Sequence, residues 1–223
     1  MGEIGVHVCA IIVAAGKGAR MGANKNKVYL ELQGHPVLAY ALRLFQINPL
    51  IQSILLVVAE GEEAEAAALA EQYQIGKLVK IVRGGNSRYA SVKNALACVD
   101  AKADLVAVHD GARPLLTEED LQAVITAAAQ ADGAILAYPL HDSIKQVQGD
   151  TIQKSLQRNE LWGAMTPQVF ALPKLLHAYA AGNVAATDDA QLVEEAGGKV
   201  LVVPGNRENL KVTTPLDMHL AEF

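Results

Sequence analysis

The sequence has few of the residues that build disulfide-rich or membrane proteins. It contains two cysteines in 223 residues, and they form no Cys-x-x-Cys pair, so we expect no disulfide framework and no cysteine-bound zinc. Both cysteines lie in apolar runs, which favours two buried and reduced thiols. No stretch approaches the ~18 consecutive apolar residues of a membrane-spanning helix, and no basic segment opens the chain. We therefore expect a cytoplasmic protein with no membrane contact.

Aromatic residues and net positive charge are also scarce. Phe, Trp and Tyr make up 4% of the chain, and its formal net charge is -5. Interfaces with nucleic acids combine a broad basic surface with aromatic side chains, so we expect no nucleic acid partner. Hydrophobic residues reach 51%, which is enough for a core, and the length fits a single domain over residues 1–223.

The basic residues that matter are concentrated in one loop. Directly after the apolar run Val8–Val13, the chain brings two closely spaced glycines and then cationic side chains. Glycine lets backbone N–H groups approach an anion closely, and cations neutralise the charge of that anion. We therefore predict a polyphosphate site that contains Gly16, Lys17, Gly18, Arg20, Lys25 and Lys27. The alternative is an ordinary strand-to-helix turn whose basic side chains are solvated.

This loop does not fit two common nucleotide motifs. The dinucleotide fingerprint Gly-x-Gly-x-x-Gly requires a glycine where this chain has Met21, and the segment His35–Tyr40 offers no acidic residue for a ribose. The Walker A pattern Gly-x-x-x-x-Gly-Lys-Ser/Thr matches from neither Gly16 nor Gly18. NAD binding and P-loop kinase or GTPase chemistry are therefore not expected.

Short apolar runs alternate with helical patterns along the chain. The predicted strands are Val8–Val13, Ile54–Ala59, Leu78–Val82, Leu105–His109, Ala134–Tyr138 and Lys199–Val203. The predicted helices are Val37–Phe45, Glu62–Tyr73, Ser87–Val99, Glu118–Ala131 and Asp188–Ala196. Nearly continuous apolar strands indicate a parallel sheet that is covered on both faces. We therefore predict an α/β fold with a doubly wound, mostly parallel sheet, whose ligands bind beyond the carboxyl ends of the strands.

One segment departs from this alternation. Ser143–Val147 and Thr151–Ser155 are polar, alternating runs on either side of Gly149-Asp150, which predicts a β-hairpin. A two-stranded ribbon is too small to be stable alone. We expect residues 139–158 to form a protruding arm that packs on a second subunit. The alternative is a solvent-exposed hairpin without a partner.

A second glycine loop, Arg83–Ser91, follows the third predicted strand. Its glycines, Gly84 and Gly85, leave backbone groups and the hydroxyl of Ser91 placed to contact the edge of a base. Taken alone, this loop is only weakly informative about function.

The fourth predicted strand ends in the tract His109–Pro114. Asp110 stands at its carboxyl end, a position suited to a Mg²⁺ ligand because this ion binds a carboxylate together with substrate phosphates. We expect His109 to pack or hydrogen-bond rather than bind metal, since no second histidine has the spacing of a ligand pair. Arg113 either clamps this metal-binding loop, and so belongs to the site, or pairs with a surface acid.

Two tracts towards the carboxyl end complete the pattern. Arg158–Gln168 holds the only tryptophan, and Asn209–Pro215 follows further on. In combination with the loops above and the tract Thr187–Asp189, they make the chain resemble the 2-C-methyl-D-erythritol 4-phosphate cytidylyltransferases. The resemblance extends over nearly the full chain, and Leu161–Gln168 is its most specific part.

The resemblance implies a nucleotide-diphospho-sugar transferase-like fold and a homodimer in which the arm clasps the second subunit. The residues that it implies for CTP binding are Ala14, Ala15, Gly16, Lys17, Gly18, Gly84, Gly85 and Ser91, with Asp110 as the Mg²⁺ ligand. Arg20 and Lys27 match residues that stabilise charge at the α-phosphate. Arg158 and Lys211 match residues that position methylerythritol phosphate. The hydroxyl contacts to substrate that it implies are Ser143, Thr166 and Thr187.

The chain departs from the family pattern at two positions. Asn26 stands where the family often has a proline, so the backbone before Lys27 is expected to be less rigid. Ser143 stands where a threonine is common, and the hydroxyl is retained while the methyl group is lost. Neither change removes a charge, so an active enzyme is expected.

The implied reaction joins CTP to 2-C-methyl-D-erythritol 4-phosphate and releases pyrophosphate, in the non-mevalonate pathway to isoprenoid precursors. Two alternatives remain from the sequence. Ribitol 5-phosphate cytidylyltransferase shares much of the pattern around Thr166-Pro167-Gln168, although Leu161-Trp162 favours methylerythritol phosphate. From a different class, the chain would be a regulator that binds CTP without turnover.

Overall fold

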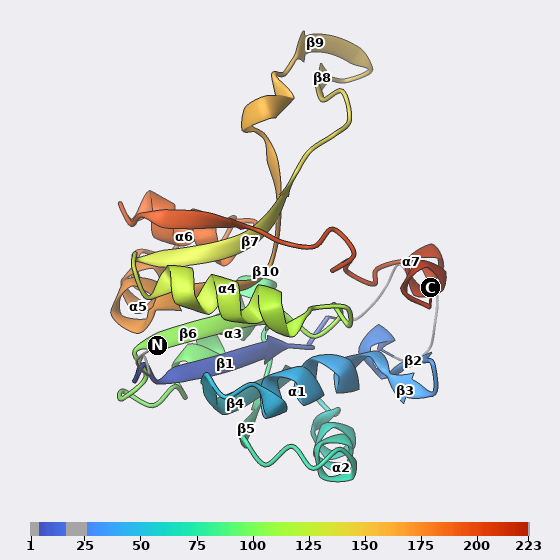
Figure 1. Ribbon diagram of the computed structural model, residues 1–223, viewed down its shortest axis with the longest axis vertical. Helices are drawn as coiled ribbons and strands as arrows, with labels where there is room; N and C mark the ends of the chain where they lie inside the picture. The colour runs from blue at the N-terminus through green and yellow to red at the C-terminus, as the bar shows by residue number, and fades with distance from the viewer. Residues whose placement is uncertain (1–4, 17–25, 223) are drawn as a thin grey trace.

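The computed structural model describes residues 5–16 and 26–222, and a seven-stranded sheet in the order β11-β7-β10-β6-β1-β4-β5 forms its centre (Figure 1). The strands of this sheet are β1 (Val8–Val13), β4 (Ile51–Val58), β5 (Leu78–Arg83), β6 (Leu105–Asp110), β7 (Gly133–Pro139), β10 (Trp162–Ala171) and β11 (Val200–Pro204). The α-helices are α1 (Val37–Ile47), α2 (Glu63–Gln72), α3 (Arg88–Leu96), α4 (Glu118–Ala128), α5 (Leu172–Ala181), α6 (Asp189–Glu195) and α7 (Pro215–Ala221). The two remaining ribbons pair β2 (Glu31–Leu32) with β3 (His35–Pro36), and β8 (Lys145–Gln148) with β9 (Thr151–Ser155).

The predicted α/β fold with a mostly parallel sheet is confirmed, with one antiparallel strand. β10 runs antiparallel to β6 and β7, whereas the other pairs in this sheet are parallel. β10 is absent from the predicted strands because the polar tract Thr166–Gln168 interrupts its apolar pattern, and its register against β7 shifts between Ala164 and Gln168. Helix α5 is also absent from the prediction, since it begins directly after Ala171 with no turn signal between the two elements.

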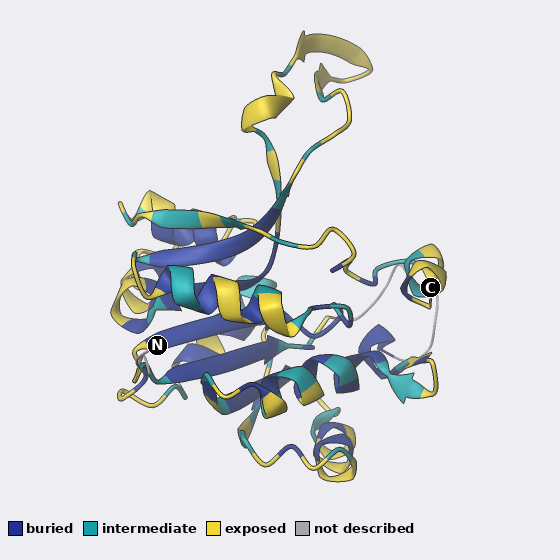
Figure 2. Ribbon diagram, in the orientation of Figure 1, coloured by how far each residue is buried: buried dark blue, intermediate teal, exposed yellow. Residues whose placement is uncertain are grey.

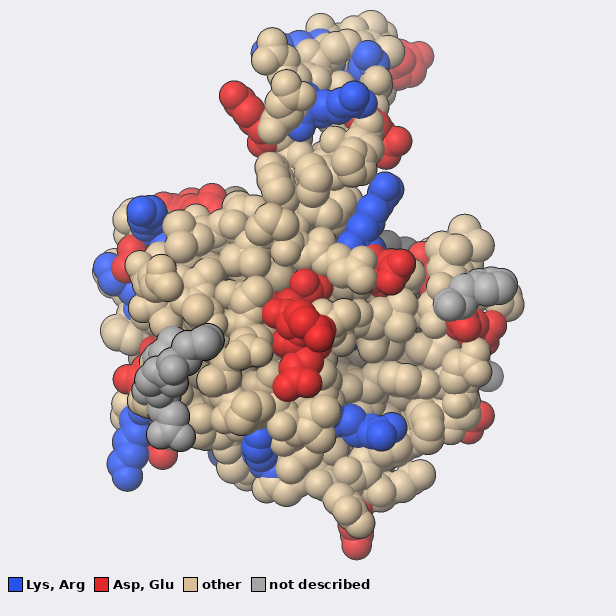
Figure 3. Space-filling view, viewed as in Figure 1, with Lys and Arg blue, Asp and Glu red and all other residues tan. Residues whose placement is uncertain are grey.

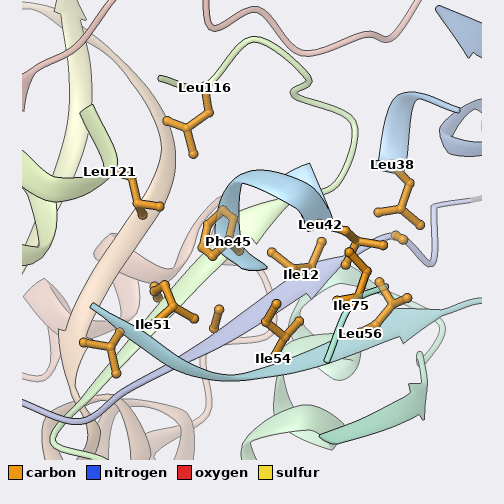
Figure 4. Close-up of a cluster of buried hydrophobic side chains, with 14 of the residues drawn as sticks. Ile12, Leu38, Leu42, Phe45, Ile51, Ile54, Leu56, Ile75, Leu116 and Leu121 are labelled. Atoms are coloured by element: carbon orange, nitrogen blue, oxygen red, sulfur yellow. The ribbon is translucent and has the colours of Figure 1, made fainter. Parts of the chain in front are cut away.

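Alternate residues of the strands face two layers of helices. In β1, Ile12 belongs to the core under α1, α2 and α4, whereas Ile11 belongs to the core under α3, α5 and α6. Figure 4 shows the first of these cores, where Phe45 of α1 lies near Ile12 and Ile54. Because both faces of the sheet are buried, its parallel strands need apolar residues at nearly every position.

The order of the strands reverses at β1. The sheet extends from β1 through β4 to β5 at one edge, and the chain then returns to β6 on the other side of β1. Val13 pairs with Asp110, so the last residues of β1 and β6 are neighbours. Doubly wound sheets bind ligands at such a reversal, beyond the carboxyl ends of the strands. The fold thus brings the end of β1 and the predicted metal ligand together.

The predicted hairpin is present as β8 and β9, which stand away from the sheet beyond the ends of β7 and β10 (Figure 1). Every residue of these two strands is exposed, in contrast to the buried centre of the sheet (Figure 2). Within the described ranges, no helix has the length and apolar character that crossing a bilayer requires. Cys9 is buried, as expected, whereas Cys98 is only half buried, and both are free thiols.

Candidate active site

A cavity of about 550 Å³ lies at the carboxyl ends of β1 and β6. The predicted site residues that line it are Ala14, Ala15, Gly16, Lys27, Gly85, Ser91, Asp110 and Lys211. Arg88, at the start of α3, also lines the cavity, although no role was predicted for it from the sequence. Four members of the predicted phosphate loop lie outside the described residues, namely Lys17, Gly18, Arg20 and Lys25.

Asp110 is the one carboxylate among the described residues that line the cavity, and cations surround it. Its Oδ2 lies 2.8 Å from Nζ of Lys211 and 3.8 Å from Nε of Arg113. Its Oδ1 lies 3.5 Å from Nε of Arg88. Burial raises the pKa of the Asp110 carboxyl, but Arg88, Lys211 and Arg113 together outweigh burial and hold this pKa well below its usual range. Asp110 is therefore ionised at physiological pH.

This arrangement fits a divalent cation that is held mainly by the phosphates of a ligand. The described residues contain no group of three or more His, Cys, Asp or Glu side chains that could hold a metal ion. Mg²⁺ in phosphate sites needs only one or two carboxylates, because substrate oxygens and water supply its other ligands. Asp110 offers one such carboxylate, and Lys211, with a side chain that is 40% exposed, has room to leave Oδ2.

Lys27 reaches the cavity from a short 3₁₀ helix, Lys27–Tyr29. Asn26 caps this helix by accepting a hydrogen bond from Val28 N over 3.4 Å, and its Nδ2 donates to Ala14 O over 2.9 Å. The sequence predicted a less rigid backbone here because proline is missing. The side chain of Asn26 counteracts that loss, since it ties the turn to the end of β1.

The glycine pair Gly84-Gly85 allows two loops to pack closely. A β-carbon on Gly84 would lie 2.5 Å from Cβ of Ala15, and one on Gly85 would lie 2.4 Å from Cβ of Ala90. Ser91 is buried, and its Oγ accepts a hydrogen bond from Gly85 N over 3.1 Å. Gly85 and Ser91 therefore stand at the cavity wall, while Gly84 packs against Ala15 from the first loop.

Thr166 lies behind Asp110 and does not line the cavity. Its Oγ1 accepts a hydrogen bond from Asp110 N over 3.0 Å and lies 3.1 Å from Nδ1 of His109. Nε2 of His109 lies 3.3 Å from the carbonyl oxygen of Arg113, so the ring donates from Nε2 and accepts the threonine hydroxyl at Nδ1. Burial lowers the pKa of His109 to about 4. The neutral imidazole and Thr166 thus fix the backbone that carries Asp110.

Arg113 clamps the loop after β6, which is the first of its two predicted alternatives. Its Nη1 donates to Asn209 O over 2.6 Å, while its Nε faces Asp110. Nδ2 of Asn209 in turn donates to Thr166 O over 2.9 Å. Burial lowers the pKa of Arg113, but a guanidinium keeps its charge at any physiological pH. The clamp joins the end of β6 to the tract that carries Lys211.

Besides Thr166, three further predicted substrate contacts do not line the cavity. Ser143 and Arg158 are exposed at the base of the arm, where Arg158 donates to the carbonyl oxygen of His141. Thr187 is exposed before α6, and its Oγ1 donates to Oε1 of Gln191 over 3.2 Å. Their contacts with substrate stay predictions.

Sequence reasoning assigned no role to Arg88 or Asp189, although both lie in tracts that it singled out. Nη2 of Arg88 lies 2.8 Å from Oδ2 of Asp189, and Asp189 is fully buried. The only signal in the sequence was their membership of Arg83–Ser91 and Thr187–Asp189. A charged residue in a loop does not reveal, from the sequence, that the fold will bury it against another charge.

The chain is similar in sequence to known proteins over most of its length. Residues 8–223 match the family IspD, 2-C-methyl-D-erythritol 4-phosphate cytidylyltransferase. The chain is similar to the 2-C-methyl-D-erythritol 4-phosphate cytidylyltransferase of Halalkalibacterium halodurans, with 42% identity over 215 residues that cover 95% of this chain and 94% of that protein. The protein of the same name from Pelotomaculum thermopropionicum is 41% identical over 220 residues, which cover 96% and 92% of the two chains.

Solved structures show the same similarity. The 4-diphosphocytidyl-2C-methyl-D-erythritol synthase of Anaerococcus prevotii has a TM-score of 0.86 at 30% identity, covering 98% of this chain and 97% of that one. The 2-C-methyl-D-erythritol 4-phosphate cytidylyltransferase of Francisella tularensis has a TM-score of 0.80 at 30% identity, covering 96% and 98%. The shared fold therefore extends over nearly the whole length of each chain.

Proposed function

Because the chain belongs to the family of 2-C-methyl-D-erythritol 4-phosphate cytidylyltransferases, we propose that the cavity at the ends of β1 and β6 is where its reaction takes place. The enzyme uses CTP and 2-C-methyl-D-erythritol 4-phosphate, and it forms 4-diphosphocytidyl-2-C-methyl-D-erythritol and pyrophosphate in the non-mevalonate pathway. The observation that carries the proposal is a cavity whose described lining residues include three cations, Lys27, Arg88 and Lys211, and one ionised carboxylate, Asp110.

The reaction requires little acid–base catalysis. A phosphate monoester has its second pKa at roughly 6, so the phosphate of the alcohol substrate is largely a dianion at neutral pH and needs no general base. One of its oxygens attacks the α-phosphorus of CTP, the bond from this phosphorus to the bridging oxygen breaks, and pyrophosphate leaves with the electron pair. The enzyme must therefore orient two anions and neutralise their repulsion.

The cations of the site serve this purpose. Lys27 and Lys211 lie at the cavity and stabilise the charge that develops on the α-phosphate, together with Arg20 from the phosphate loop. Gly85 and Ser91 contact the cytosine, and the backbone at Ala14 to Gly16 faces the triphosphate.

Asp110 would hold a Mg²⁺ ion jointly with the phosphates of CTP. When bound, the metal supplies neutralisation and orientation of the triphosphate. We expect EDTA to abolish pyrophosphate release and Asp110→Asn to raise the Mg²⁺ concentration needed for half-maximal rate. An unchanged requirement in this variant would remove Asp110 from the metal site.

The whole chain acts as one nucleotidyltransferase domain, and residues 139–158 serve as its dimerisation arm. Arg158 and Ser143 lie apart from the cavity within one chain, yet the family pattern assigns them to the alcohol phosphate. A two-fold homodimer resolves this separation if the arm of one subunit lies over the cavity of the other. Exposed apolar residues on the arm, Val147 at 52% and Ile152 at 59%, offer a surface for the contact.

A pyrophosphate-release assay tests the function directly. Turnover with CTP is expected with methylerythritol 4-phosphate and not with ribitol 5-phosphate. CTP is expected to be preferred over ATP and GTP, because the loop from Gly84 to Ser91 is predicted to accept a pyrimidine. Faster turnover with ribitol 5-phosphate would contradict the alcohol substrate, and equal turnover with ATP would contradict the selectivity for cytosine.

A further inference from the structure

Asp189 is a buried carboxylate that the reaction described above does not use. It is the first residue of α6, its exposed fraction is 0%, and it does not line the cavity. Its Oδ1 accepts a hydrogen bond from the hydroxyl of Tyr179 over 2.5 Å, and its Oδ2 lies 2.8 Å from Nη2 of Arg88. A buried carboxylate is costly unless a cation and hydrogen bonds compensate it. Asp189 therefore depends on Arg88 for the positive charge that compensates its burial.

Arg88 connects this buried carboxylate to the cavity. Its side chain is 26% exposed, and its Nε lies 3.5 Å from Oδ1 of Asp110. A guanidinium is planar and rigid, with donors on different edges, so contacts with two carboxylates fix both its position and its plane. Arg88 is therefore held between the end of β6 and the start of α6.

The two oxygens of Asp110 consequently differ in how they are held. Oδ1 faces Arg88, a cation that is anchored from behind by Asp189. Oδ2 faces the more exposed Lys211 over 2.8 Å and Nε of Arg113 over the longer distance of 3.8 Å. Removal of the anchor would leave Arg88 able to turn, and the contact of Arg88 with Oδ1 of Asp110 would no longer be fixed in position.

We propose that Arg88, anchored by Asp189, is a positioning residue that holds the Asp110 carboxylate in the orientation in which it binds the metal complex of CTP. This inference rests on the proposed metal role of Asp110. It concerns the binding of the nucleotide and not the transfer step, so it can be tested without the alcohol substrate.

The test is a double-mutant cycle on the magnesium enhancement, defined as the ratio of the CTP dissociation constant in EDTA to that in saturating Mg²⁺. Titration calorimetry with CTP alone measures both constants. Residues that orient a metal ligand change metal affinity by roughly tenfold or more when they are replaced, so Asp189→Asn is expected to reduce the enhancement about tenfold. Asp110→Asn reduces it at least as much. The double variant Asp110→Asn, Asp189→Asn is expected to equal Asp110→Asn alone, because the anchor acts through that residue.

Two further variants distinguish the positioning role of Arg88 from a general loosening of the structure around α6 and from the loss of a positive charge. Asp188→Asn is the matched control, because Asp188 caps α6 and accepts from Gln168 but has no contact with Arg88 among its hydrogen bonds. It is expected to keep the wild-type enhancement. Arg88→Lys keeps the charge but not the planar fork, so it is expected to behave like Asp189→Asn.

The outcomes distinguish this inference from the function on which it rests. Losses that add in the double variant, an equal loss in Asp188→Asn, or full retention in Arg88→Lys would each overturn the positioning role. A fall in CTP affinity that is equal in EDTA and in Mg²⁺ would also overturn it, because it would indicate direct or structural support of the nucleotide. An unchanged enhancement in Asp110→Asn would instead refute the metal role of Asp110, and the inference with it, while pyrophosphate release would still identify the enzyme.

Discussion

The cavity and the arm carry the two parts of the predicted active site, and they are built in opposite ways. At the cavity, Asp110 is surrounded by Arg88, Arg113 and Lys211, and hydrogen bonds fix the backbone beneath it. On the arm, every residue of both strands is exposed (Figure 2). Figure 3 shows basic and acidic side chains together on the surface of the arm, and a separate acidic group over α4.

The contrast between the cavity and the arm indicates which part of the predicted site a single chain can form alone. A buried charge has to be paired inside the chain, so folding alone sets the geometry around Asp110. An isolated two-stranded ribbon has no core to hold it and gains its stability from a partner surface. Nucleotide binding should therefore depend on the fold, whereas binding of the alcohol phosphate by Arg158 should depend on assembly.

The largest contrast is expected in stability. Ile54 of β4 is fully buried and Ile152 of β9 is 59% exposed. Ile54→Ala should lower the free energy of unfolding by about 2–5 kcal/mol, because it leaves a cavity in the core. Ile152→Ala should change it by less than about 0.5 kcal/mol. Urea denaturation at a concentration where the chain is monomeric measures both, and similar losses would show that the arm is part of the folded core.

A second contrast concerns pH and compares two histidines. The pKa of His109 falls from 6.5 to about 4 on folding because the ring is buried. Between these values the unfolded chain binds a proton that the folded chain does not, so stability is complete above pH 6.5 and falls as the pH decreases to 4. The loss is on the order of 3 kcal/mol.

Urea denaturation at several pH values measures this slope. His109→Gln should be less stable than wild type but should lack this part of the pH dependence. His141→Gln, at the exposed base of the arm, should keep the wild-type pH dependence of stability. A wild-type slope in His109→Gln would assign the effect to other groups.

The third contrast concerns the transition state. Lys27→Ala should reduce kcat about 100-fold, equivalent to about 2.7 kcal/mol, since it removes a preorganised charge at the cavity. Arg20→Ala should cause a similar loss. Lys80→Ala, an exposed lysine on β5, should leave kcat unchanged. Steady-state kinetics with both substrates would reject this role if Lys27→Ala raised KM for CTP at constant kcat, because that result indicates uniform binding.

The smallest expected effect tests whether the arm of one subunit reaches the cavity of the other. Lys27→Ala and Arg158→Ala homodimers should each be inactive, and subunit exchange between them should restore roughly a quarter of the wild-type activity. About half of the dimers are then mixed, and each mixed dimer has one intact site if the arm reaches the partner's cavity. Mass spectrometry confirms the exchange. Exchange without recovered activity would mean that each site is built within one chain.

The sequence predicted the fold well where its signal was local. The apolar runs that become β1 and β6 were predicted directly, because a strand buried on both faces requires apolar residues at successive positions. β10 gave no such signal, since its polar segment at Thr166 supports Asp110 from behind and not the core. Its antiparallel direction depends on where the arm returns to the sheet, which no local pattern specifies.

The residues of the candidate site also divide into those with a local signal in the sequence and those without one. The glycine loop and Asp110 were predicted from local features, namely a glycine pair followed by cations and a carboxylate at the end of a strand, whereas Lys211 was predicted only from the resemblance to the family. The buried role of Thr166 was not predicted, because a threonine hydroxyl in the sequence gives no indication of whether it faces a ligand or a backbone N–H group. The tie between Arg88 and Asp189 was equally invisible, since the two residues are far apart along the chain.

From the sequence, hydrophobic spacing predicts the class of fold and the glycine–cation loop predicts a phosphate site, because both signals lie within short stretches of chain. The family follows from the resemblance over nearly the full chain. Tertiary structure alone decided which charges meet. Asp110, Arg88 and Asp189 come from β6, α3 and α6, and the crossovers of a doubly wound sheet bring them together. Burial then makes their pairing obligatory, because a charge removed from water is stable only beside its counterpart.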